Sequence, residues 1–292
     1  MKVAFFGKSY DNNYDAFMKA VIHKLSDNGV KIIVYKQFWD DLSHCFDNSV
    51  DFQLFNSHEQ LKDNADMLFS FGGDGTILDT LPLIRESNIP VIGINTGHLG
   101  FLSSVSEEEA LDAVQNIIEN KYDIEPRTMI QIEDENRIFD GVNYALNEIS
   151  IMRENSGSLI IINVYIDGIL LNTYWADGLI LATPTGSTAY SMSVGGPIMT
   201  PNTDSILITP IAAHNLSVRP VVIPDTSNVT IKVEGRCENF VLGLDSRTKL
   251  LNKSIQIKIK KTNFSFNMVK MYEKNFFTTL RHKLLWGNDV RN

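Results

Sequence analysis

The chain has 292 residues, 43% hydrophobic and 21% charged, a composition typical of a soluble globular protein with one large domain or two moderate ones. Its formal net charge is -9 and it has no dense run of Lys and Arg, which argues against nucleic acid or an anionic membrane as the main partner. Cys45 and Cys237 are isolated, so the sequence predicts neither a disulfide framework nor a zinc motif and favours a reducing compartment. Because no apolar stretch is long enough for a signal peptide or a membrane span, we expect a cytoplasmic protein.

The first part of the chain alternates between strand-like and helix-like patterns. Strands are expected at short apolar runs, residues 2–7, 30–35, 52–55, 65–71 and 90–95. Helices are expected where apolar side chains recur every three or four residues, at 14–25, 38–46, 76–84 and 106–118. This alternation predicts a mainly parallel sheet covered by helices on both faces, with ligands bound beyond the carboxyl ends of its strands.

From about residue 123 the pattern changes to short strands separated by turns. These strands are expected at 129–132, 145–151, 160–166, 169–171, 179–182, 206–209, 229–233, 240–244, 255–259 and 264–268. Asp167-Gly168 suits a type I′ hairpin turn, and a helical interruption is expected only after Pro184. We therefore expect an α/β domain over residues 1–122, an all-β domain over 123–272, and a helix within 273–292 that packs back on the first domain.

A glycine-rich turn follows the strand expected at 65–71. Gly72, Gly73 and Gly75 surround Asp74, and Thr76 opens the next expected helix. Glycines permit a sharp turn whose amides face a phosphate, and a helix start favours an anion. A carboxylate in such a place is unfavourable unless it binds a divalent metal or takes a proton from an attacking hydroxyl. The structural alternative, for this motif alone, is a tight turn with a capping Asp.

Two more polar segments follow apolar strands. Asn147-Glu148 offers an amide and a carboxylate that suit sugar hydroxyls. Residues 177–197 run from Asp177-Gly178 through a hydroxyl-rich turn, in which Tyr190 can stack on a planar base. Alone, these segments are equally typical of an exposed strand end and a Ser/Thr-rich helix cap. Together with the glycine loop they predict a phosphorylated ligand with a ribose and a base.

Residues 72–76, 93–102, 147–148 and 177–197 resemble, in order, the motifs of the NAD kinase family. Diacylglycerol, sphingosine and phosphofructokinases share the short glycine motif, whereas the Thr-Pro-Thr-Gly-Ser-Thr-Ala-Tyr segment separates NAD kinases from them. The resemblance is strongest over residues 65–210. It implies an α/β nucleotide-binding domain and a β-sandwich NAD-binding domain, assembled into homodimers or homotetramers. It also implies ATP-dependent phosphorylation of the adenosine ribose 2′-hydroxyl of NAD, which gives NADP.

The resemblance further implies roles for individual residues. Asp74 is the expected catalytic base, and a divalent cation, Mg²⁺ in particular, is expected to bind mainly through ATP, with no dedicated protein ligand. Asp177 is expected on the nicotinamide side, and Ala212 toward an NAD bound mainly by a neighbouring subunit. The residues expected to bind NAD or the nucleotide are Asp74, Gly75, Asn147, Glu148, Asp177, Thr188, Ala189, Tyr190, Ser191, Met192, Ser193 and Ala212.

Three residues depart from the family pattern. Asp79 stands where many members have a basic residue, Arg247 replaces a glutamine that touches NAD in some members, and Trp175 lacks a charge that others carry. Because of these departures, the resemblance does not predict which phosphate donor is used, whether NADP(H) inhibits, or whether NADH is a substrate. Two alternative functions remain open on the sequence: a related small-molecule or lipid kinase with the same glycine loop, and a non-catalytic NAD(H)-binding regulator.

Overall fold

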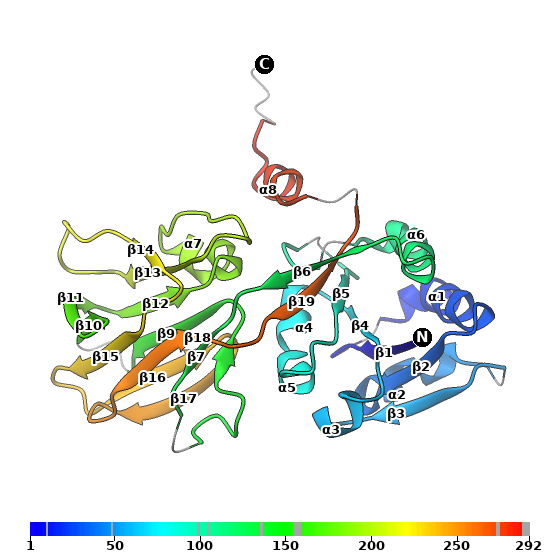
Figure 1. The fold of residues 1–292 in the computed structure, drawn as a ribbon, viewed down its shortest axis with the longest axis horizontal. Coiled ribbons are helices and arrows are strands. Elements are labelled where there is room, and N and C mark those ends of the chain that lie inside the picture. The colour runs from blue at the N-terminus through cyan, green and yellow to red at the C-terminus, as the bar shows by residue number, and fades with distance from the viewer. Residues whose placement is uncertain are drawn as a thin grey trace. The chain divides into compact units, whose positions relative to one another are not determined.

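The computed structural model (Figure 1) describes residues 1–9, 11–47, 49–97, 100–103, 105–134, 137–154, 159–272 and 275–287. Its contacts define two units, one of Met1–Pro126 with Asn267–Asn292 and one of Arg127–Phe266. Part of the segment expected to form the C-terminal helix, residues 273–274 and 288–292, lies outside the described residues. Within the described part of the chain, no helix has the length and apolar character needed to cross a membrane.

A seven-stranded sheet forms the centre of the first unit, in the order β3-β2-β1-β4-β5-β19-β6. Its strands are β1 (Lys2–Phe6), β2 (Lys31–Tyr35), β3 (Phe52–Phe55), β4 (Met67–Phe71), β5 (Val91–Ile94), β6 (Asp123–Arg127) and β19 (Phe266–Lys270). Neighbours from β3 to β19 pair in parallel. All five residues of β4 are buried, as expected of an apolar run covered on both faces.

The first unit also contains short and long helices. They are η1 (Asn12–Tyr14), α1 (Asp15–Asp27), α2 (Lys36–Leu42), η2 (Ser43–Cys45), α3 (His58–Leu61), α4 (Asp74–Leu78), α5 (Leu81–Ile84), α6 (Glu107–Ile118) and α8 (Phe276–Leu284). Ser106 and Glu109 form a capping box at the start of α6, the helix expected at 106–118. The C-terminal helix α8 contacts the first unit, because the Phe276 ring lies 6.5 Å from the Phe101 ring and Lys283 Nζ lies 5.8 Å from it.

The second unit is a sandwich of two six-stranded antiparallel sheets, ordered β11-β10-β15-β18-β7-β8 and β14-β13-β12-β9-β16-β17. The strands are β7 (Ile130–Ile132), β8 (Tyr144–Ala145), β9 (Glu148–Arg153), β10 (Ile160–Ile166), β11 (Ile169–Ala176), β12 (Gly178–Ala182), β13 (Ser205–Ile211), β14 (Val221–Pro224), β15 (Val229–Glu234), β16 (Asn239–Leu244), β17 (Arg247–Asn252) and β18 (Ile257–Lys261). Inward side chains of both sheets form one apolar core. The helical interruption after Pro184 is η3 (Thr185–Thr188) followed by α7 (Tyr190–Ser193).

The hairpin expected at Asp167-Gly168 is present between β10 and β11. Both turn residues have positive φ, +49° and +84°, as a type I′ turn requires. One strand lies elsewhere than expected: the strand predicted at 264–268 is β19, which pairs with β5 in the sheet of the first unit. A short apolar run is compatible with a strand in the first unit or in the second, so the sequence pattern did not decide between the two units.

Candidate active site

The glycine loop follows the carboxyl end of β4 in the first unit. Gly72 has a φ of +143°, and a Cβ there would lie 2.3 Å from Thr76 Oγ1, so the position requires glycine. A Cβ at Gly73 or Gly75 would meet no atom within 4 Å. The backbone of the loop therefore has open space beside it at these two glycines, as the close approach of a ligand needs.

Asp74 opens α4, and its carboxylate is fixed by the segment that follows β5. Oδ1 accepts hydrogen bonds from the Leu102 N–H at 3.0 Å, the Ser103 N–H at 2.9 Å and Ser103 Oγ at 3.0 Å. Oδ2 accepts one from the Phe101 N–H at 2.8 Å. Since a carboxylate oxygen has two lone pairs, Oδ2 keeps one without a donor among the described residues. The arrangement orients the carboxylate and also holds it still.

The segment that holds Asp74 is itself built on close contacts. Asn95, which is buried, donates from Nδ2 to Ser103 Oγ at 2.9 Å and accepts from the Gly97 N–H at 2.6 Å. A Cβ on Gly100 would lie 1.8 Å from Asp74 Oδ1. The sequence analysis included residues 93–102 among the family-like motifs but did not identify Ser103 and Gly100 as the residues that position the carboxylate.

These contacts predict opposite effects of two glycine substitutions on stability. Gly100→Ala forces the Asp74 carboxylate away from its donors, so we expect the free energy of unfolding to fall by about 1–3 kcal/mol. Gly75→Ala meets no atom and improves helix propensity inside α4, so we expect no loss and a gain of up to about 1 kcal/mol. Urea unfolding of both variants measures the difference; equal destabilisation by the two would contradict it.

In the second unit, Asp245 holds the segment that contains Asn147 and Glu148. Its carboxylate accepts from the N–H groups of Leu146, Asn147 and Glu148 at 2.9, 2.8 and 3.1 Å. Arg247, in the same turn region, donates from its guanidinium to the backbone carbonyls of Val142 and Tyr144. The sequence did not predict the role of Asp245, because its partners lie almost a hundred residues away.

Glu148 carries the clearest electrostatic signal of the second unit. Its Oε2 is buried and has no hydrogen-bond partner among the described residues. Burial, and secondarily the charge of Asp245, raises the pKa of Glu148 to about 8, although the N–H of Tyr190 donates to the carboxyl. A buried carboxyl oxygen that lacks a donor favours a ligand that brings one, such as a sugar hydroxyl.

The hydroxyl-rich segment lies directly against Asn147. The Thr183 N–H donates to the Asn147 carbonyl at 2.9 Å, and Thr183 Oγ1 donates to the Leu146 carbonyl at 2.5 Å. A Cβ on Gly186 would lie 2.0 Å from the Asn147 carbonyl oxygen, so only glycine fits there. The structure thus brings together Asn147, Glu148 and the start of α7 at one end of the paired strands β9 and β12.

Tyr190 reaches along β9 toward the other end of that strand. Its side chain is 40% exposed, and its hydroxyl lies 3.9 Å from Met152 Sδ. Glu148 and Met152 share one face of β9 with Ser150 between them, because side chains alternate along a strand. Gly243, paired with Ser150 on β16, leaves space there, since a Cβ would lie 2.5 Å from Ser150 Oγ.

Asp177 and Ala212 lie at this second end, near Met152. The Asp177 carboxylate forms a salt bridge with the Arg153 guanidinium at 3.0 Å, and the Asp177 N–H donates to the Ile211 carbonyl at 3.0 Å. Ala212 is exposed and has a φ of +45°, which is strained for a residue with a side chain. The ends of β12, near Asp177 and Glu148, are separated by about 13 Å, four residues of strand. The residues expected to bind NAD in this unit therefore fall into two groups.

The remaining expected residues differ in exposure. Ser193 is exposed, and Thr188, Ala189 and Met192 are half-buried. Ser191 is fully buried, and its hydroxyl lies 2.9 Å from Thr209 Oγ1, so in this structure it anchors α7 to β13. A ligand contact of Ser191 stays a prediction. Asp79, which departs from the family pattern, pairs with Lys8 Nζ at 2.5 Å.

Comparisons with family models, curated relatives and solved structures all point to the same family of proteins. Models of the ATP-NAD kinase N-terminal and C-terminal domains match residues 3–122 and 146–271. Two curated NAD kinases, of Flavobacterium psychrophilum and Bacteroides fragilis, are 44% and 41% identical, and each alignment covers 100% of both chains. The crystal structure of yeast NADH kinase complexed with NADH has a TM-score of 0.86 and 28% identity, covering 100% of this chain and 89% of that one. An Archaeoglobus fulgidus NAD kinase in complex with ATP shares the fold, with a TM-score of 0.75, 24% identity and coverage of 98% and 99%.

Proposed function

The chain belongs to the NAD kinase family, and we propose that it transfers the γ-phosphoryl group of ATP to the 2′-hydroxyl of the adenosine ribose of NAD, which gives NADP. The observation that carries the proposal is the Asp74 carboxylate, fixed by hydrogen bonds beside a glycine loop that is open at Gly73 and Gly75. A fixed acceptor beside a loop that a phosphate can approach is what phosphoryl transfer to a hydroxyl requires.

In this mechanism Asp74 takes the proton of the 2′-hydroxyl as the oxygen attacks the γ-phosphorus, the bond from that phosphorus to the β–γ bridging oxygen breaks, and ADP leaves. The free lone pair of Oδ2 receives that proton, while the hydrogen bonds from residues 101–103 keep the carboxylate in place. The backbone beside Gly73 and Gly75 approaches the nucleotide. A divalent cation such as Mg²⁺, bound mainly through ATP, would supply neutralisation of the charge on the transferred group, with no dedicated protein ligand proposed.

NAD lies along the outer face of β9 in the second unit. Asn147 and Glu148 bind ribose hydroxyls, and the unpartnered Oε2 of Glu148 accepts one of them. The adenosine is bounded by Thr188, Ala189, Tyr190, Met192 and Ser193. Asp177 lies about 13 Å farther along the strands, a separation that suits the nicotinamide half of an extended dinucleotide. Ala212, near Asp177, faces an NAD bound mainly by a neighbouring subunit in this proposal.

Tyr190→Ala tests the stacking role of this exposed ring. A ring stacked on adenine stabilises substrate and transition state about equally, so we expect KM for NAD to rise about tenfold or more while kcat changes little. Steady-state kinetics with saturating ATP measure both constants. Tyr190→Phe is the matched control, because it keeps the ring and removes only the weak hydroxyl contact with Met152. An unchanged KM with a collapsed kcat would show that the ring acts in another way.

We also expect self-association into a homodimer or homotetramer. The edge strand β11 of the second unit exposes Ile169, Leu170 and Trp175 at 75%, 52% and 54%, and such apolar side chains on a sheet edge favour burial against another chain. Sedimentation of the purified protein measures the state. The cytoplasmic location expected from the sequence stays a prediction.

The test of the function is formation of NADP from NAD, ATP and Mg²⁺ by the purified chain. A related lipid or small-molecule kinase would consume ATP only with another hydroxyl acceptor. A non-catalytic regulator would bind NAD(H) without turnover under any donor or metal. Running NADH beside NAD, and polyphosphate beside ATP, decides the acceptor and donor preferences in the same assay.

A further inference from the structure

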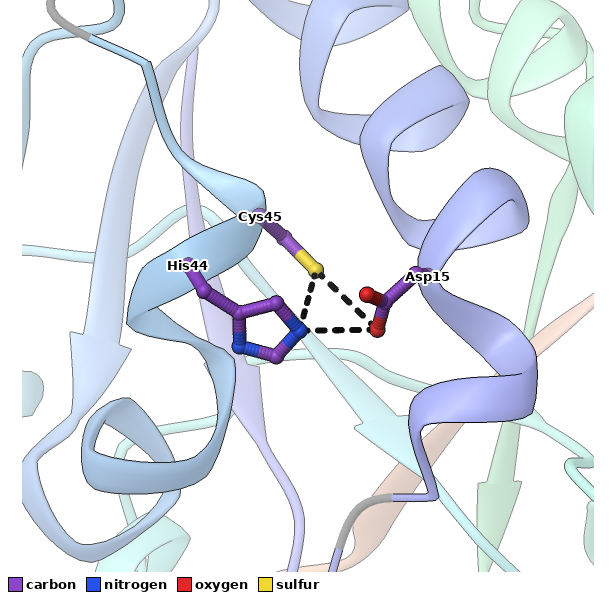
Figure 2. Close-up of side chains that lie close together, drawn as sticks. All are labelled: Asp15, His44 and Cys45. Atoms are coloured by element: carbon purple, nitrogen blue, oxygen red, sulfur yellow. Dashed lines mark hydrogen bonds and ion pairs between the residues drawn. The ribbon is translucent and has the colours of Figure 1, made fainter.

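Three side chains that ordinarily ligate metals, none of them part of the glycine loop, converge in the first unit (Figure 2). Asp15 is the first residue of α1, and His44 and Cys45 end the η2 turn. Asp15 Oδ1 lies 2.8 Å from His44 Nε2, Cys45 Sγ lies 3.6 Å from the same nitrogen, and Sγ lies 3.7 Å from Oδ1. A carboxylate oxygen, an imidazole nitrogen and a thiol sulfur thus form a small triangle.

This triangle does not have the geometry of a nucleophilic cysteine triad. In such a triad one ring nitrogen of the histidine contacts the thiol, and the other contacts the carboxylate that orients the ring. Here Nε2 alone faces both Cys45 Sγ and Asp15 Oδ1. One nitrogen cannot accept the thiol proton and donate to the carboxylate at the same time, so a relay through the ring is excluded in this arrangement.

The same triangle has nearly the dimensions of a tetrahedral zinc site. Zinc bonds of about 2.3 Å to sulfur and about 2.0–2.1 Å to nitrogen and oxygen place tetrahedral S–N and S–O pairs about 3.5 Å apart, and N–O pairs about 3.3 Å apart. The two sulfur distances, 3.6 and 3.7 Å, already fit. The N–O distance of 2.8 Å needs to open by about 0.5 Å, the change from a hydrogen bond to shared coordination.

The surroundings also suit a bound cation. Cys45 is only 2% exposed and belongs to the apolar core of the unit, whereas the side chains of His44 and Asp15 are 43% and 29% exposed. The ion therefore has an apolar wall behind it and a path from solvent in front. Sulfur, nitrogen and oxygen donors together select zinc over Mg²⁺ or Ca²⁺, which prefer oxygen alone.

We propose that Asp15, His44 and Cys45 bind one zinc ion, with a water molecule as the fourth ligand. On binding, the thiol proton is released to solvent, neutral His44 coordinates through Nε2, and Asp15 through Oδ1. The ion links the start of α1 to the end of η2, segments 29 residues apart in sequence. The site is independent of the proposed kinase reaction, and its effect is to stabilise the folded first unit.

The experiment measures zinc binding to the full chain after treatment with a chelator, by competition with a chromophoric chelator of known affinity. We expect one zinc per chain and a higher Tm with zinc than without it. Cobalt in place of zinc is expected to give a sulfur-to-metal charge-transfer band. Cys45→Ser, His44→Gln and Asp15→Asn are each expected to weaken binding about a hundredfold or more, and Cys45→Ser to abolish the cobalt band.

Matched controls are present in the chain. Cys237→Ser removes the other cysteine, and His23→Gln disrupts a histidine–aspartate pair, with Asp47 at 3.4 Å, that is not part of this cluster. Both controls are expected to bind zinc like the wild type. Sub-stoichiometric zinc, or equal binding by wild type and the Asp15→Asn and His44→Gln variants, overturns the proposal. If Cys45→Ser does not fold, those two variants and the cobalt band of the wild type decide it.

Discussion

Asp74→Asn is expected to lower kcat by about 10² to 10⁴ while NAD still binds, because a general base typically contributes that much. The amide is nearly the same size as the carboxylate, so it keeps an oxygen for the donors of Leu102 and Ser103. The NH₂ group of the new asparagine then faces the Phe101 N–H. Both groups are donors, so the hydrogen bond from Phe101 is lost. We therefore expect folding to survive with a loss of about 1 kcal/mol.

Ser103→Ala is the matched control for Asp74→Asn. It removes one donor, Oγ at 3.0 Å, from the same carboxylate but leaves the base itself. We expect Ser103→Ala to lose about as much stability as Asp74→Asn but much less kcat. That result would show that the carboxylate of Asp74 acts in the reaction and does not merely hold the loop. The measurement is kcat, calorimetric NAD affinity and Tm for both variants across a magnesium series, since magnesium restores a weakened metal complex but not a missing base. An Asp74→Asn enzyme that keeps more than about a tenth of the wild-type rate would rule out an essential base.

The central strands were predictable from sequence, as were the edge strands β3 and β11, whereas three other edge strands were missed. β4 and β12 are buried along their whole length, so their apolar runs identify them directly. The missed strands β6, β14 and β17 are all at an edge of their sheet. An edge strand has one solvated side and tolerates proline, so Asp-Ile-Glu-Pro-Arg in β6 carries no apolar signal.

Candidate site residues could be proposed from sequence where a local motif carries them. Asp74 and Glu148 stand in short polar motifs beside apolar strands, so the sequence pointed to both as candidates. Ser103 and Asp245, which hold these two segments, are 29 and 97 residues from their partners. The Asp15–His44–Cys45 cluster joins segments 29 residues apart without any ligand spacing known from motifs, and the isolated cysteine pointed away from zinc. Such pairings are set by the topology of the fold rather than by local pattern.

Glu148→Gln is expected to stabilise the free protein while it weakens NAD binding. The pKa of Glu148 is about 8 in the folded chain, against an ordinary value of 4.5, so the folded state holds a proton that the unfolded state releases. The wild-type free energy of unfolding therefore falls as pH rises from about 4.5 to 8. Glutamine does not titrate, so the stability advantage of the variant grows over that window. For this half-buried group we expect it to reach about 1–3 kcal/mol at pH 8.

The NAD affinity of the wild type is expected to change in the opposite direction over the same pH window. An ionised carboxylate accepts a ribose hydroxyl more strongly than a neutral carboxyl does, so we expect binding to favour the ionised form, to release a fraction of a proton below pH 8, and to tighten as pH rises toward about 8. The Glu148→Gln variant is expected to bind NAD about tenfold or more weakly than the wild type at pH 8, and its NAD affinity is expected to show no such pH dependence. Calorimetry in two buffers of different ionisation enthalpy counts the released proton, and urea unfolding from pH 5 to 9 measures stability. A wild-type affinity independent of pH, together with tight binding by Glu148→Gln, would remove Glu148 from the ribose site and leave its buried oxygen without a ligand.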